Sequence, residues 1–83
     1  MRAARLIAYR APLELTDLPD PECPTDGVVL RVLACGICRS DWHSWCGSDP
    51  DVRLPHVPGH EYCGVIEAVG AEVTRWRLGE RVI

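Results

Sequence analysis

Two stretches rich in proline and turn-forming residues divide this chain and confine regular structure to short segments. Residues 19–26 and residues 48–58 each hold three of the seven prolines. Proline lacks a backbone donor and clashes with a preceding helical turn, so neither stretch can sustain a helix or a central strand. We expect both to be irregular surface connections, and the 83 residues to form one domain at most, with a small core.

Alternating apolar residues predict the strands. Within residues 28–34, Val28, Leu30 and Val32 share one face and the intervening residues share the other, which is the period of a strand. The expected strands are residues 2–10, residues 13–15 paired with them, residues 28–34, residues 61–69 and the beginning of a further strand at residues 79–83.

One short helix is expected between the two best-defined strands. Residues 35–38 are predicted to turn around Gly36, Ser40 can start a helix that reaches Cys46, and Gly47 would end it. Several short strands, one short helix and long loops predict a mainly β fold, a small barrel or a sandwich.

Composition excludes several classes of function. All nine basic residues are arginines, spread along a chain of net charge −3, so no nucleic-acid footprint is present. The absence of lysine excludes a Schiff base and a phosphate-loop lysine. No apolar run approaches the roughly 20 residues of a membrane span. Five cysteines, an odd number, and the lack of a signal-peptide core predict a reducing, cytoplasmic location.

Residue types that bind metals gather in one third of the chain. They are Cys35, Cys38, His43, Cys46, His56, His60 and Cys63. The C-x-x-C of residues 35–38 fits a zinc knuckle, a redox dithiol or an accident, and no second C-x-x-C exists to make a zinc ribbon. If residues 61–69 form a strand, His60 and Cys63 point to opposite faces, so Cys63 is expected to be a buried small apolar residue.

Four short motifs carry a family resemblance. They are GICRSDWH at residues 36–43, PGHE at 58–61, GVIEAVG at 64–70 and GERV at 79–82. In order and spacing they resemble the zinc-dependent alcohol dehydrogenases of the medium-chain dehydrogenase/reductase family. The resemblance implies a GroES-like partial β-barrel with one short helix. It also implies that residues 1–83 are the N-terminal portion of the catalytic domain, with the nucleotide-binding domain absent.

The resemblance also implies roles for individual residues. Cys38 resembles the first ligand of the catalytic zinc and His60 the second, with Glu61 in or next to the coordination sphere; the third ligand lies in the family beyond residue 83. Ser40 would take the alcohol proton and pass it to His43 through the ribose of NAD or NADP. Arg39 resembles the residue that meets the cofactor pyrophosphate.

The chemistry explains why a metal is needed. An alcohol, like water, has a pKa far above the value of about 6.5 for a free imidazole, so His43 alone faces a wide gap in pKa. A zinc ion removes most of this gap as a Lewis acid. The metal would thus be the main catalytic device, and the histidine would dispose of the proton.

Simpler interpretations stand beside several of these roles. Ser40 can be a plain helix cap, and Asp41 fits an orienting carboxylate better than a base. Trp42 and Trp45 are expected to pack in the core, although Trp45 could line a substrate pocket, and His56 is expected to lie in a loop. Cys23, Cys35 and Cys46 have no ligand role in the resemblance.

Three hypotheses remain open from the sequence. The first is a portion of an NAD(P)-linked dehydrogenase that acts on a small alcohol or carbonyl substrate and is inactive alone, since no G-x-G-x-x-G is present. The second is a non-catalytic zinc-binding GroES-like module. The third is a thiol redox protein that uses Cys35 and Cys38. A homo-oligomeric assembly is left open, and no nucleic-acid or membrane partner is expected.

Overall fold

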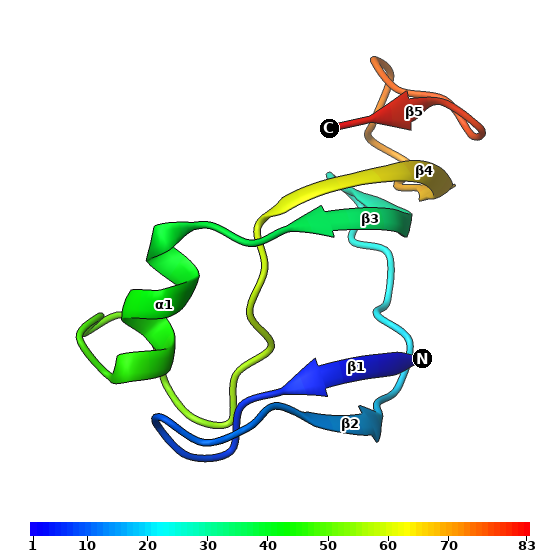
Figure 1. Ribbon diagram of the computed structural model, residues 1–83. Coiled ribbons are helices and arrows are strands. Elements are labelled where there is room, and N and C mark those ends of the chain that lie inside the picture. The colour runs from blue at the N-terminus through cyan, green and yellow to red at the C-terminus, as the bar shows by residue number, and fades with distance from the viewer. The chain divides into compact units, whose positions relative to one another are not determined.

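The computed structural model describes all 83 residues and consists mainly of short strands with one helix (Figure 1). The elements in chain order are β1 (Arg2–Arg5), β2 (Glu14–Asp17), β3 (Val28–Gly36), α1 (Arg39–Cys46), β4 (Glu61–Val69) and β5 (Arg81–Val82). The prediction of a mainly β fold with one short helix is confirmed. None of the structure's helices has the length and apolar character that a membrane crossing requires.

The chain forms two compact units, each built from two separate segments. The first unit comprises residues 1–19 and 37–60, and the second comprises residues 20–36 and 61–83. Both units contain one sheet, and the helix belongs to the first unit. Each is described separately below as unit 1 and unit 2.

Unit 2 is built on an antiparallel sheet of order β3-β4-β5. Val28 pairs with Val69 at one end and Gly36 with Glu61 at the other, with register shifts in between. The side chain of Ile66 is 2% exposed and forms the core of this unit. Gly64 is buried, and a side chain there would meet the Arg31 carbonyl, so this position in β4 requires glycine.

Unit 1 combines the antiparallel pair β1-β2 with helix α1. Leu6 is 1% exposed, and its backbone exchanges hydrogen bonds of 2.7 and 3.0 Å with His56. The segment between the strands is tied to the helix, because the Trp45 indole donates to the Ala11 carbonyl at 2.7 Å and the Arg10 N–H donates to the Trp45 carbonyl at 2.8 Å. These bonds fix the C-terminal half of α1 within the unit.

Helix α1 begins earlier than the sequence predicts. Cys38 is the N-cap residue, and its N–H donates to the Asp41 carboxylate at 3.0 Å, so the interpretation of Ser40 as the cap is wrong. The third helical residue can reach back in this way because it faces the N-cap across one turn. Gly47 ends the helix as predicted, with a left-handed φ of 82°.

Four of the five predicted strands have other bounds in the structure, and the last of them, expected over residues 79–83, is limited to Arg81–Val82. The first strand ends at Arg5 rather than residue 10, because the chain turns at Tyr9 and Arg10, where φ is 59°. The second strand occupies Glu14–Asp17 rather than residues 13–15. Strand β3 continues through Cys35 and Gly36 because Tyr62 and Glu61 of β4 pair with them, so the turn predicted around Gly36 is wrong.

Candidate metal centre

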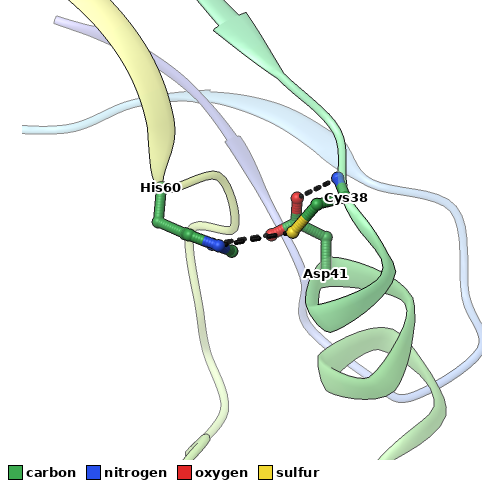
Figure 2. A group of neighbouring side chains, drawn as sticks. All are labelled: Cys38, Asp41 and His60. Atoms are coloured by element: carbon green, nitrogen blue, oxygen red, sulfur yellow. Dashed lines mark hydrogen bonds and ion pairs between the residues drawn. The ribbon is translucent and has the colours of Figure 1, made fainter. Parts of the chain in front are cut away.

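Cys38, Asp41 and His60 of unit 1 bring one donor atom each to within 4.8 Å of one another (Figure 2). Cys38 Sγ lies 3.3 Å from His60 Nε2, although 22 positions separate the residues in the chain. Figure 2 shows the thiol at the start of the helix turned toward the imidazole, which comes from the segment that precedes β4. The structure therefore brings together the two residues that the sequence assigns to a metal.

The position of Cys38 suits an anionic ligand. Its backbone is extended, with φ −125° and ψ 177°, as expected of an N-cap residue, and its side chain is partly buried. The unpaired N–H groups of the first helical turn carry partial positive charge, which favours a negative group nearby. A thiolate at this position would receive that stabilisation.

His60 is oriented through its second ring nitrogen. Its Nδ1 lies 3.5 Å from Asp41 Oδ1, while Nε2 faces the sulfur of Cys38. The preceding Gly59 has a φ of 105°, which a residue with a side chain rarely adopts, and its N–H donates to Asp41 Oδ1 at 3.2 Å. The side chain of His60 as a whole is 57% exposed.

Asp41 is held in its ionised form. The N–H of Cys38 lowers the pKa of this carboxyl below its usual 3.8, partial burial opposes the shift, and the Gly59 N–H and the nearby His60 lower the pKa further. An ionised carboxylate next to Nδ1 favours the tautomer that carries its proton there, which leaves Nε2 free to bind a metal. The orienting role expected for Asp41 agrees with these contacts.

The donor set and its spacing fit zinc. Thiolate and imidazole are preferred zinc ligands, with a Zn–S bond of about 2.3 Å and a Zn–N bond of about 2.05 Å. A tetrahedral site therefore places the sulfur and the nitrogen about 3.6 Å apart. The 3.3 Å between Sγ and Nε2 is close to this value. Two side chains of the types that bind zinc thus lie close together within unit 1.

The side chain of Ser40 also belongs to this group, because it contacts both Cys38 and His60. Its Oγ lies 2.9 Å from Cys38 Sγ and 3.2 Å from His60 Nε2. No local sequence pattern indicates this double contact, because it depends on the path that returns His60 to the start of the helix. Sequence reasoning also missed the bond from Gly59 to Asp41, for the same reason.

The other expected cofactor and substrate residues lie on the helix. Arg39 and Trp42 line an open hollow, and the Trp42 ring packs edge-on against His43, with ring centroids 5.5 Å apart. Trp42 is 50% exposed, so the prediction that it packs in the core is wrong. Trp45 is partly buried.

Glu61 and Cys63 belong to unit 2, whereas Cys38, Asp41 and His60 belong to unit 1. Glu61 begins β4 opposite Gly36, and its carboxylate lies beside that glycine. Cys63 is partly buried, opposite Ala34. All five cysteines are free, and Cys35 is a residue of strand β3, so the turn that a redox dithiol at residues 35–38 would use is not formed.

Comparison with known proteins gives one consistent result. Residues 24–83 match the family model described as the alcohol dehydrogenase GroES-like domain. An alcohol dehydrogenase of Geobacillus stearothermophilus is 40% identical over 83 residues, which is 99% of this chain and 25% of that protein. The chain therefore spans about a quarter of the length of this relative.

Solved structures show the same partial coverage. An NAD-dependent alcohol dehydrogenase matches with a TM-score of 0.90 and 36% identity, over 98% of this chain and 24% of the other. An alcohol dehydrogenase zinc-binding domain protein from Burkholderia ambifaria matches with a TM-score of 0.86 and 37% identity, over 99% of this chain and 22% of the other. The fold of these 83 residues is thus the fold of the corresponding quarter of such chains.

Proposed function

Because this chain belongs to the alcohol dehydrogenase GroES-like domain family, we propose that it forms part of a zinc-dependent, NAD(P)-linked dehydrogenase that interconverts an alcohol with an aldehyde or ketone. In this proposal the 83 residues are the N-terminal portion of the catalytic domain, and the nucleotide-binding domain lies outside them. The family membership supports the class of reaction, and one of the similar structures is named for its dependence on NAD.

The proposed zinc ligands are Cys38 and His60. The observation that carries this assignment is the 3.3 Å between Sγ and Nε2, in two residues that no local structure would bring together. Glu61 follows His60 directly in the chain, and we propose that it acts in or next to the coordination sphere. A similar structure from Burkholderia ambifaria is named as a zinc-binding domain protein.

The proposed mechanism assigns a task to each side chain. A zinc ion held by Cys38 and His60 would supply Lewis-acid chemistry that lowers the pKa of an alcohol hydroxyl toward neutrality. Asp41 keeps the imidazole of His60 in the orientation that exposes Nε2. Ser40, whose Oγ lies among these donor atoms, accepts the proton of the alcohol.

The remaining helix residues serve the cofactor in this proposal. His43 takes the proton onward through the ribose of NAD or NADP, and Arg39 meets the pyrophosphate as a fixed positive charge. The positions of His43 and Arg39 on α1 support these roles. A spacing of three residues puts Ser40 and His43 on one face of the helix, and Arg39 is exposed. The open hollow that Arg39 and Trp42 line is available to a ligand.

Substrate class and location complete the proposal. We propose a small alcohol or carbonyl substrate and a cytoplasmic location. The five free thiols agree with a reducing compartment.

Zinc binding by a Cys38→Ser variant tests the assignment. We expect the 83-residue chain to bind one zinc ion and Cys38→Ser to lose at least about 100-fold in affinity, because a thiolate ligand is removed. Cys23→Ser is the matched control, since Cys23 is exposed and belongs to unit 2. Competition with a chromophoric chelator measures the affinities. Equal binding by wild type and Cys38→Ser would exclude this zinc site.

A further inference from the structure

Two arginines of unit 2 stand on either side of Val65 in one row across the sheet, in which β4 lies between β3 and β5 (Figure 1). Arg31 of β3 is the register partner of Val65 in β4, and Val65 is in turn the partner of Arg81 in β5. Register partners in neighbouring strands carry their side chains on the same face of a sheet. Arg31, Val65 and Arg81 therefore share one face.

The row lies on the face of the sheet opposite to the buried Ile66. Ile66 follows Val65 in β4 and is 2% exposed, and successive side chains of a strand point to opposite faces. The pairing is regular from Leu30 to Val32, so the register shifts to either side leave the row intact. Both arginines are exposed, whereas Val65 is partly buried.

The positive charges of the two arginines lie close together without a carboxylate bound to either. Neighbouring strands are about 4.8 Å apart, which places the Cα atoms of Arg31 and Arg81 about 10 Å from each other. Neither side chain forms an ion pair or a hydrogen bond, and Glu67, exposed two positions after Val65, is bonded to neither. Two like charges on one face favour an anion placed between them.

We propose that Arg31 and Arg81 together bind the phosphate group of a small molecule above Val65. Each guanidinium presents a planar fork of N–H donors that matches the oxygens of a carboxylate or a phosphate. A carboxylate has two oxygens and occupies one fork, whereas a phosphate monoester has three terminal oxygens and a charge of about −1.5 to −2, so it can accept from both forks. This site belongs to unit 2 and does not depend on the proposed zinc ligands.

Val65 suits the base of such a site. Its side chain is short and uncharged, so the longer arginine side chains can lean over it from both neighbouring strands and cover its apolar surface with their methylene groups. Charge-assisted hydrogen bonds above an apolar surface are stronger than the same bonds in bulk water, because the local dielectric constant is lower. The neutral residue in the middle of the row therefore favours the anion as much as the two charges do.

Titration of the 83-residue chain with methyl phosphate, followed by NMR at constant ionic strength, tests the site. We expect a saturable shift of the Val65 amide resonance in the wild type. Arg31→Gln and Arg81→Gln should each weaken binding about tenfold or more, because each removes charge-assisted hydrogen bonds. Arg77→Gln is the matched control and should bind like the wild type, since Arg77 is also exposed and belongs to unit 2.

A double variant distinguishes one shared site from a general effect of charge. If both arginines hold the same phosphate, Arg31→Gln combined with Arg81→Gln should bind little more weakly than either single variant. Arg31→Lys keeps the charge without the planar fork, so it should also bind more weakly, and it replaces Arg31→Gln if circular dichroism shows that glutamine disturbs the sheet. The inference is overturned by a wild type without a saturable shift, by equal weakening in Arg77→Gln, by additive losses, or by acetate binding as tightly as methyl phosphate.

Discussion

The carboxylate of Asp41 joins two backbone N–H groups and one imidazole ring of unit 1 at the candidate site. One oxygen accepts the N–H of Cys38 ahead of the helix, and the other accepts the N–H of Gly59 and lies beside the His60 ring. Each bond involves an ionised acceptor, which makes it stronger than a bond between neutral groups. The geometry of Cys38 and His60 therefore depends on a residue that need not touch the metal.

We predict that Asp41→Asn weakens zinc binding about tenfold, because the amide orients the imidazole less strongly than the carboxylate does. It should also lower the unfolding free energy of the metal-free chain by about 1 kcal/mol, since the capping bond of α1 is weakened. Chelator competition and urea unfolding measure the two effects. Asp51→Asn is the control because Asp51 is exposed and lies outside the cluster, and equal losses in both variants would contradict the prediction.

The lowered pKa of Asp41 also predicts a pH dependence. A carboxyl whose pKa in the folded chain lies below its ordinary value of 3.8 contributes fully to stability above that pH. The contribution is lost as the pH falls through the folded pKa. The difference in unfolding free energy between wild type and Asp41→Asn should therefore be greatest above pH 3.8 and shrink below it. A difference that grows with acidification would refute this assignment.

At the scale of elements, helix α1 is short and is defined by its two ends. Its eight residues carry little intrinsic stability, since isolated helices of that length are marginal in water. The N-terminal end is held by Asp41 and the C-terminal end by Gly47, against which the Tyr9 ring packs. These ends fix where the helix places Ser40 relative to Cys38.

We predict that Gly47→Ala destabilises the chain by about 1–2 kcal/mol from its left-handed backbone alone, with a further loss from the Tyr9 ring, whose nearest atoms lie 3.1 Å from the new methyl position. Gly79→Ala is the matched control. Gly79 has a similar φ of 87°, but no atom lies within 4 Å of an added methyl group. Urea unfolding should therefore show a larger loss for Gly47→Ala, and equal losses would rule out the Tyr9 contribution.

For the whole molecule, the division into two units determines where the buried side chains and the candidate zinc cluster lie. Unit 1 buries Leu6 and unit 2 buries Ile66, each at most 2% exposed, and no other hydrophobic side chain reaches full burial. A chain of this size has few stabilising contacts to spare, so the free energy of metal binding becomes part of its folding free energy. All residues of the candidate zinc cluster belong to unit 1.

We predict that zinc slows amide hydrogen exchange mainly in unit 1. The N–H of His56, bonded to Leu6, should gain protection, while the N–H of Ile66, bonded to Glu80 in unit 2, should change less. The reason is that a ligand stabilises the region that binds it unless the whole chain unfolds together. Equal gains at both amides would show that the two units unfold as one. Mg²⁺ serves as the control ion.

We also predict that the 83-residue chain alone oxidises no alcohol with NAD or NADP. It spans about a quarter of its relatives, and its sequence contains no G-x-G-x-x-G loop for the cofactor. Absorbance of the reduced nicotinamide, measured with zinc present, checks this. Turnover by the purified chain that is absent in Cys38→Ser would contradict the prediction. It would indicate that these 83 residues catalyse the reaction without the nucleotide-binding domain.

The sequence by itself determined the element types, the end of the helix and the pair of metal-binding residue types. Period-two alternation in residues 28–34 and a glycine at position 47 are local signals, so they predict a strand and a helix end without the tertiary structure. Only the tertiary structure decided where β1, β2 and β3 end and which atoms Ser40 contacts. Pairing with β4 carries β3 through Cys35 and Gly36, and the return of His60 to the start of α1 surrounds Ser40 with two donor atoms. Both depend on contacts between distant segments, which no local pattern encodes.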